Sequence, residues 1–222
     1  MKKPLLLAAA ALCAALALPS AAQAQGIRLG VKAGVNYTNL AGDLADEDRY
    51  ESKIGPHAGL MVNVGLLDDG FLSLQPELLF SQKGFKYAES ERMDALGNRY
   101  KFSGKVNYNY LDLPILFKIN ADGLFFELGP QVGYLLSVSN DVTTVVNSRT
   151  TTNSSTYNNL DNVNRTELGY AAGLGYESDM GLMLGLRYNG GLSKYGKNDS
   201  GDFKNARNSA FMLSLGYFFG GK

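Results

Sequence analysis

The feature that most constrains this chain is a strict alternation of apolar residues with polar or small ones after residue 25. In residues 27–37 the odd positions are all apolar, and the even positions hold Arg28, Gly30, Lys32, Gly34 and Asn36. A period of two residues is typical of β-strands with one apolar face, whereas amphipathic helices repeat every ~3.6 residues. The alternation recurs in eight segments, which we expect to be strands: 27–37, 58–66, 72–81, 111–119, 126–136, 168–176, 182–188 and 211–219.

The lengths of these strands and of their connections favour a membrane barrel. Eleven residues at ~3.3 Å each, tilted by roughly 40°, rise about 27 Å, which is close to the apolar band of an outer-membrane barrel. Short connections at 68–70, 120–123 and 178–179 alternate with long ones at 41–53, 84–104, 140–164 and 194–208. All long connections therefore lie at the same end of the predicted barrel. The pattern predicts an all-β fold, an eight-stranded antiparallel up-and-down transmembrane β-barrel with short periplasmic turns and long extracellular loops.

The same alternation would also suit a soluble, lipocalin-like ligand-binding barrel, in which the apolar faces point inward. The composition of the two faces favours the membrane. The apolar faces contain no charged residue, and a lysine or arginine facing lipid at mid-membrane costs ~2–4 kcal/mol. The opposite faces are rich in glycine, which leaves room inside a narrow barrel for long side chains to cross. The tyrosines expected on the apolar face, as in an aromatic girdle, are Tyr37, Tyr134, Tyr170, Tyr176, Tyr188 and Tyr217.

The faces expected to point inward carry equal numbers of acids and bases. The four bases are Arg28, Lys32, Lys118 and Arg187, and the four acids are Glu77, Asp112, Glu127 and Glu167. Unpaired buried charges are costly, so this balance predicts a paired polar network in the barrel interior. We hypothesise that the network fixes the strand register and fills the lumen. The alternative is a hydrated network that forms a narrow pore.

The first residues have the organisation of a secretory signal peptide. Two lysines precede an apolar run at 5–18, and the small-x-small sequence Ala-Gln-Ala follows at 22–24. We therefore predict that residues 1–24 are a cleaved signal peptide and that residues 25–222 form the outer-membrane β-barrel domain. The chain's one cysteine, Cys13, lies in the apolar run, so the mature protein is expected to have neither a disulfide nor a reactive thiol.

Motifs for catalysis or cofactor binding are weak. The 21 basic and 21 acidic residues balance, so no basic patch for nucleic acid is indicated. Residues 191–197 have the spacing of a phosphate-binding loop, but Asn198 replaces the metal-binding hydroxyl and no helix follows. His57 is the one histidine, and we expect a structural or surface role for it. The acidic stretch 43–51 lacks the ligand spacing of a calcium loop. We expect no metal and no cofactor.

Five sequence blocks resemble a known family. They are GVKAGVN at 30–36, LQPELLFSQKG at 74–84, YLDLPILFK at 110–118, ELGPQVGY at 127–134 and GLRY at 185–188. They are similar to the PorT-like outer-membrane β-barrel domain that is abundant in Bacteroidota. The resemblance implies an eight-stranded antiparallel barrel with a polar interior and implies little about activity. One branch of that family contributes to protein secretion.

The sequence thus predicts a non-enzymatic, integral protein of the bacterial outer membrane. Its barrel is expected to be an anchor in outer-membrane lipid, and its loops 41–53, 84–104, 140–164 and 194–208 are expected to bind an extracellular ligand or protein partner. A narrow pore, an accessory component of secretion and an enzyme at the barrel rim are the alternatives.

Overall fold

The computed structural model describes residues 26–41, 50–67, 70–94, 98–147, 149–157, 164–193 and 207–219. The predicted signal peptide lies outside these residues. Ten strands occur in the described ranges. Their bounds are β1 (Ile27–Ala41), β2 (Tyr50–Glu51), β3 (Lys53–Gly65), β4 (Leu72–Met93), β5 (Arg99–Ala121), β6 (Leu124–Val146), β7 (Arg149–Tyr157), β8 (Thr166–Glu177), β9 (Leu182–Gly191) and β10 (Arg207–Phe218). None of the described residues belongs to a helix that is long and apolar enough to span a membrane.

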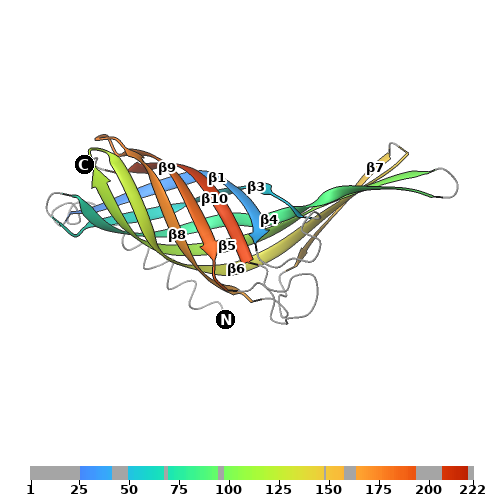
Figure 1. Cartoon of the computed structure of the whole chain (residues 1–222), viewed down its shortest axis with the longest axis horizontal. Helices are drawn as coiled ribbons and strands as arrows, with labels where there is room; N and C mark the ends of the chain where they lie inside the picture. The colour runs from blue at the N-terminus through green and yellow to red at the C-terminus, as the bar shows by residue number, and fades with distance from the viewer. Residues whose placement is uncertain are drawn as a thin grey trace.

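Eight of these strands close into a ring. Its order is β1-β3-β4-β5-β6-β8-β9-β10, and β10 pairs with β1 to complete it. Every pairing is antiparallel. Neighbouring strands along the chain are also neighbours in the ring (Figure 1). The predicted eight-stranded up-and-down barrel is therefore confirmed.

The predicted faces point as expected for a membrane barrel. On β1, Val35 and Tyr37 are 47% and 55% exposed, whereas Lys32 and Asn36 are buried. The same alternation runs along β10, where the leucines and aromatic residues at odd positions are exposed and the residues between them are buried. The apolar residues therefore cover the outside of the barrel, which is the opposite of a soluble ligand-binding barrel.

The short connections are tight turns at one end of the barrel, which we call the turn end. Between β5 and β6, Asp122 and Gly123 have φ angles of 51° and 87°. Both residues therefore adopt the left-handed conformation that a two-residue type I′ turn requires, and an Asp-Gly sequence favours this turn. Between β8 and β9, the amide of Ser178 donates to the carbonyl of Leu182 at 2.8 Å.

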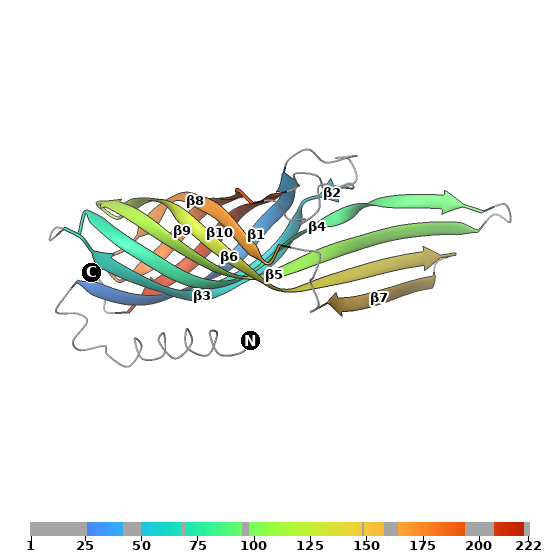
Figure 2. The same ribbon diagram turned by 90° about the horizontal axis from the view of Figure 1, so that it is seen from below.

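At the other end, two of the predicted loops are largely strand, which corrects the sequence interpretation. The predicted loop 84–104 is mostly the outer part of β4 and β5, and the predicted loop 140–164 holds the end of β6 and all of β7. Residues 85–93, 99–108, 138–146 and β7 form a four-stranded antiparallel sheet, here called the blade, which extends beyond the barrel (Figure 2). The Thr-, Ser- and Asn-rich segments at 140–146 and 149–157 lie on β6 and β7, which pair with each other without a shift in register. Residues 42–49 and 194–206 of the other two predicted loops lie outside the described residues.

A β-bulge separates the barrel from the blade. Tyr110 pairs with Leu135, and Asn109 pairs with Ser137, so Leu136 is an extra residue in β6. The bulge shifts the alternation by one residue. As a result Val138, rather than Ser137, follows Leu135 on the side of the sheet that faces the lumen.

Candidate functional site

All eight residues of the predicted polar network lie inside the barrel. Seven of them are buried, and the side chain of Arg28 is 22% exposed near the turn end. Two further ionisable residues, Lys83 and Glu177, join them. The ten side chains form three clusters that follow one another along the lumen.

The central cluster is built around Glu77. Its carboxylate accepts hydrogen bonds from Lys32 Nζ at 3.2 Å and from Arg187 Nη1 at 2.7 Å. Arg187 Nε also donates to Glu127 at 2.6 Å. These four residues come from β1, β4, β9 and β6, so the cluster links every second strand of the ring. These ion pairs across the lumen constrain the relative positions of strands that share no backbone hydrogen bonds.

The cluster at the turn end is built around Glu177. Lys118 Nζ and Arg28 Nη1 each lie 2.6 Å from a different oxygen of this carboxylate. The lysine ammonium also lies 4.2 Å from the ring centre of Phe125, which is a favourable cation–π distance. Phe125 packs in a small apolar cluster with Met61, Met183 and Phe218. Charge pairs and apolar side chains together fill this level of the barrel.

The third cluster lies toward the blade and is built around Lys83. Its ammonium lies 3.1 Å from Asp112 Oδ1 and 2.8 Å from Glu167 Oε1. Asn208 Nδ2 donates to Glu167 Oε2 and, at 3.2 Å, to the hydroxyl of Tyr110. The three clusters together hold five bases and five acids. The charge balance predicted from four of each is therefore kept when Lys83 and Glu177 are included.

Within the described ranges, the other candidate residues form neither a catalytic nor a metal-binding arrangement. His57 is buried, so a surface role for it is wrong, and its Nε2 lies 2.9 Å from the Ser214 hydroxyl inside the barrel. Among the described residues, Nδ1 of this ring has no hydrogen-bond partner, so no carboxylate completes a catalytic triad. In the same residues, no group of three or more potential metal ligands occurs. Most of the phosphate-loop-like stretch and of the acidic stretch lies outside the described ranges.

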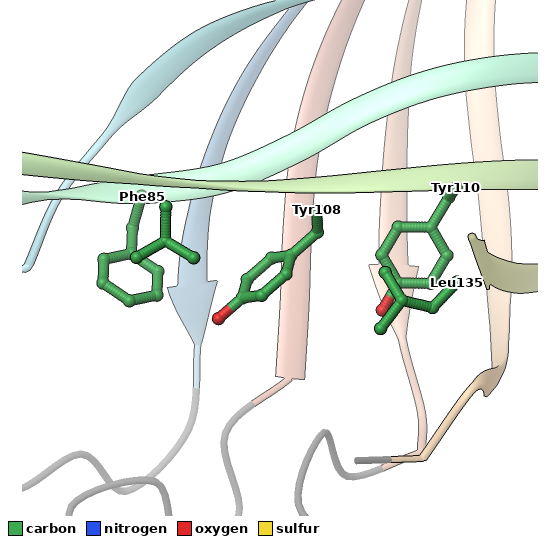
Figure 3. Packing of buried hydrophobic residues seen from close by; sticks show 5 residues of the cluster. Phe85, Tyr108, Tyr110 and Leu135 are labelled. Carbon is green, nitrogen blue, oxygen red and sulfur yellow. The ribbon is translucent and has the colours of Figure 1, made fainter. Parts of the chain in front are cut away.

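The blade has two chemically different faces, which was not predicted. Residues paired across neighbouring strands lie on the same face of a sheet, so the register shows which face of the blade each residue occupies. The inner face, which continues the lumen side, carries the aromatic rings Phe85, Tyr87, Tyr100, Phe102 and Tyr108. Phe85 and Tyr108 point from the sheet to the same side as Tyr110 and Leu135 of the barrel mouth (Figure 3).

The rings of the inner face contact one another. The ring centre of Phe85 lies 5.1 Å from that of Tyr50, 5.2 Å from that of Tyr87 and 6.1 Å from that of Tyr108. Further out, Tyr100 and Phe102 stack with ring centres 6.3 Å apart. The barrel mouth is thus continuous with a row of aromatic side chains on the blade.

The outer face of the blade is charged and hydroxylated. Lys101 Nζ lies 2.6 Å from Glu89, and Lys105 Nζ lies 3.3 Å from Asp141. A hydrogen bond from the Ser154 hydroxyl lowers the pKa of Asp141 below its usual value. The hydroxyls of Thr143 and Thr152 lie 3.1 Å apart across β6 and β7. This face is suited to contact with water.

The outside of the barrel carries aromatic side chains near both ends. Toward the blade end, the ring centre of Tyr188 lies 6.0 Å from that of Tyr170 and 5.0 Å from that of Phe211. Toward the turn end, those of Tyr217 and Phe219 lie 5.6 Å apart. Leucines such as Leu128 and Leu184, 60% and 54% exposed, occupy the band between them. Two aromatic girdles that flank an apolar band are the surface of a membrane-spanning barrel.

Comparison with known proteins gives one family match and several solved structures of low sequence identity. The family model described as outer membrane protein beta-barrel domain matches residues 21–195. Comparison with curated protein sequences gives no match. Among solved structures, the attachment invasion locus protein Ail of Yersinia pestis is 15% identical, with 88% of this chain and 99% of that chain covered and a TM-score of 0.40. Neisserial surface protein A is 13% identical, with coverage of 85% and 96% and a TM-score of 0.39. The outer membrane protease OmpT of Escherichia coli is 12% identical, with coverage of 87% and 96% and a TM-score of 0.35.

The family match covers most of the chain, including β1 and every barrel strand from β3 to β9. The closed ring, the outward apolar band and the polar lumen are the features that such a domain requires. The chain therefore belongs to the outer membrane protein β-barrel domain family and is an integral protein of the bacterial outer membrane.

Proposed function

We propose that the barrel is a non-catalytic anchor and that the blade is the surface through which the protein binds or adheres outside the cell. The observation that carries this proposal is the group of exposed aromatic and apolar side chains on the inner face of the blade. Tyr87, Phe102 and Val142 on this face are 37–39% exposed, and Tyr157 is 53% exposed. Clustered aromatic and apolar side chains beyond the membrane are typical of interaction surfaces.

The orientation of the blade supports an external role. In outer-membrane barrels the short turns face the periplasm and the long connections face outward. The blade lies at the end opposite to the short turns (Figure 2). The binding surface that we propose is formed by the paired strands of the blade, which occupy much of the predicted loops 84–104 and 140–164. The loops 41–53 and 194–208 are also predicted to contribute to binding. The identity of the partner stays a prediction.

A barrel without its blade provides the test of this proposal. Residues 86–105 are replaced by Asn-Gly between the paired Phe85 and Val106, and residues 139–156 are replaced by Asn-Gly between the paired Val138 and Tyr157. We expect this variant to fold, with a heat-dependent shift in gel mobility, because all three lumen clusters remain. Fluorescent liposomes that carry the full chain should be retained on arrays of immobilised polysaccharides and secreted glycoproteins, and liposomes with the bladeless variant should be lost.

Equal retention of the two kinds of liposome would contradict a binding role for the blade. Retention of neither would contradict it as well if the full-chain liposomes also fail to bind one another. Liposomes with lipid alone give the background. A variant with Lys101→Ala on the outer face serves as the matched control, because it leaves the inner face and the register unchanged.

We further propose that the lumen does not conduct. Three charged clusters cross the lumen, and apolar side chains of Met61, Phe125, Met183 and Phe218 pack at the turn end. An eight-stranded barrel is just wide enough for its own side chains. Purified protein in a planar bilayer is expected to show no sustained conductance, with a porin recorded in the same bilayers as the positive control. Sustained current steps would favour the narrow-pore alternative.

The finer assignments remain proposals. We infer from the blocks at 74–84 and 110–118 that the chain is of the PorT-like type, and from residues 1–24 that a signal peptide directs its export. A role in secretion would show as a stable protein partner after extraction in mild detergent. The lack of a cofactor and of catalysis is likewise our expectation, and turnover of a phospholipid or peptide by the purified protein would contradict it.

A further inference from the structure

β7 forms one edge of the blade and has unusual properties for an edge strand. Its nine residues are all exposed, and they pair with β6 in nine consecutive pairs without a shift in register. Within the described residues, no strand pairs with its other side. Such an edge presents unpaired backbone N–H and C=O groups, which can pair with another strand.

The opposite edge of the blade, formed by β4, is protected against pairing with a further strand, in contrast to β7. The outer part of β4 has a register shift between Tyr87 and Ser90, and it carries Glu89, Glu91 and Arg92. Bulges and charged side chains are the usual means by which proteins prevent pairing at a sheet edge. β7 has no proline, no lysine, no carboxylate and no bulge, and its single charge is Arg149 at one end. Only one edge of the blade is therefore open to strand addition.

The sequence of β7 is complementary to itself in an antiparallel register centred on Asn153. In this register Thr150 faces Thr156, Thr151 faces Ser155, Thr152 faces Ser154, and Asn153 faces its own copy. Hydroxyl residues opposite one another can form favourable cross-strand hydrogen bonds. At each end Arg149 faces Tyr157, an arrangement that allows a cation–π contact. The two Arg149 side chains lie at opposite ends of the pair, so they do not repel each other.

We propose that β7 pairs with β7 of a second copy of this chain and joins two blades into one continuous antiparallel sheet. This inference rests on the proposed external role of the blade and names its partner. Antiparallel pairing is closed by a twofold axis through the Asn153 pair, as in an isologous dimer. The axis is perpendicular to the strands, so it places the two barrels at opposite ends of the joined sheet. The pairing therefore links proteins in two facing membranes.

Cysteine pairs test the register directly. Opposed Cα atoms in an antiparallel pair are about 4.5–5.5 Å apart, which is within disulfide range. In a Cys13→Ser background, Asn153→Cys should give disulfide-linked dimers when liposomes carrying it are mixed and mildly oxidised. Thr150→Cys alone and Thr156→Cys alone should not, whereas a mixture of these two liposome populations should. Equal cross-linking by all three single variants would overturn the proposed register.

Introducing a charge at the centre of the pair tests the interaction without a covalent bond. Liposomes with the unmodified chain should aggregate, and those with the bladeless variant should not. Asn153→Lys and Asn153→Asp should each abolish aggregation, since like charges would face each other. A mixture of the two populations should regain it, and Asn153→Ser, the uncharged control, should keep it.

Failure of this inference is distinguishable from failure of the proposed function. Full-chain liposomes that are retained on the arrays in a blade-dependent manner but never aggregate would overturn the pairing of β7 and leave the binding role intact. Aggregation that persists in Asn153→Lys would show that the copies meet elsewhere on the blade, and it too would overturn the pairing.

Discussion

Replacing Glu77 by leucine is expected to destabilise the barrel by about 3–5 kcal/mol, the cost of leaving buried charges without their partner. The substitution removes the carboxylate that Lys32 and Arg187 share at the centre of the lumen. Urea-induced unfolding of the protein in liposomes, followed by tyrosine fluorescence and by heat-dependent gel mobility, measures the change. Lys101→Ala is the matched control, because its partner Glu89 is exposed on the blade and surface pairs contribute only ~0–1 kcal/mol.

A companion variant separates stability from register. Replacing Lys32, Glu77, Glu127 and Arg187 together by methionine removes every charge of the central cluster and leaves none unpaired. Such replacements are often neutral or stabilising. If the cluster fixes the register, as we hypothesise, this variant should be as stable as the parent but should fold into more than one species on the gel. A fourfold variant as unstable as Glu77→Leu would contradict this account of the network.

Replacing Gly129 by valine is expected to cost about 1–3 kcal/mol and to lower the folded yield, as overpacking does in tight interiors. A Cβ atom at this position would lie 1.9 Å from the carbonyl oxygen of Ile115 and 2.9 Å from the Cα of Leu116. Both are backbone atoms of β5, so the two strands must separate to admit the side chain. Refolding yield in detergent and the urea midpoint measure the effect.

Gly65→Ala is the control for this substitution. The nearest atoms to a Cβ at Gly65 lie 3.7 Å away, which is an ordinary contact. We expect its stability to stay within about 0.5 kcal/mol of the parent. An unchanged barrel in Gly129→Val would mean that β5 and β6 can move apart at no cost.

The barrel was predictable because the same requirement on its two faces applies to every membrane-spanning strand and therefore repeats along the sequence. Each strand must place apolar groups in lipid and small or polar groups in the lumen, so a period of two residues marks every spanning segment and both of its faces. The polar network followed from this pattern. Lys83 and Glu177 were missed because each lies just beyond the end of a predicted strand, next to a glycine or a turn. Extending the alternation from Ser81 by two residues, or from Gly175 by two, would have found them.

The blade was not predictable by the same reasoning. Beyond the membrane neither face is required to be apolar, so Thr, Ser and Asn residues can occupy a paired strand without any hydrophobic signal. The bulge at Leu136 also shifts the alternation, so the inner faces of barrel and blade do not share one period. What makes residues 138–146 and 149–157 strands is the backbone pairing of β6 with β5 on one side and with β7 on the other. The pairing of β6 with residues 99–108 of β5 joins segments that are distant along the chain, so it is not visible in local sequence.

The strands β4, β5 and β6 run without interruption from the membrane into the blade, and this continuity has a mechanical consequence. A pull on the blade away from the cell acts along the strands, whereas the hydrogen bonds between strands lie across them. The bonds are then loaded in shear and share the tension, instead of opening one at a time as in a peeled hairpin. Force applied at the tip of the blade is therefore transmitted along these strands to the barrel wall, and the load is distributed over the whole length of the paired strands.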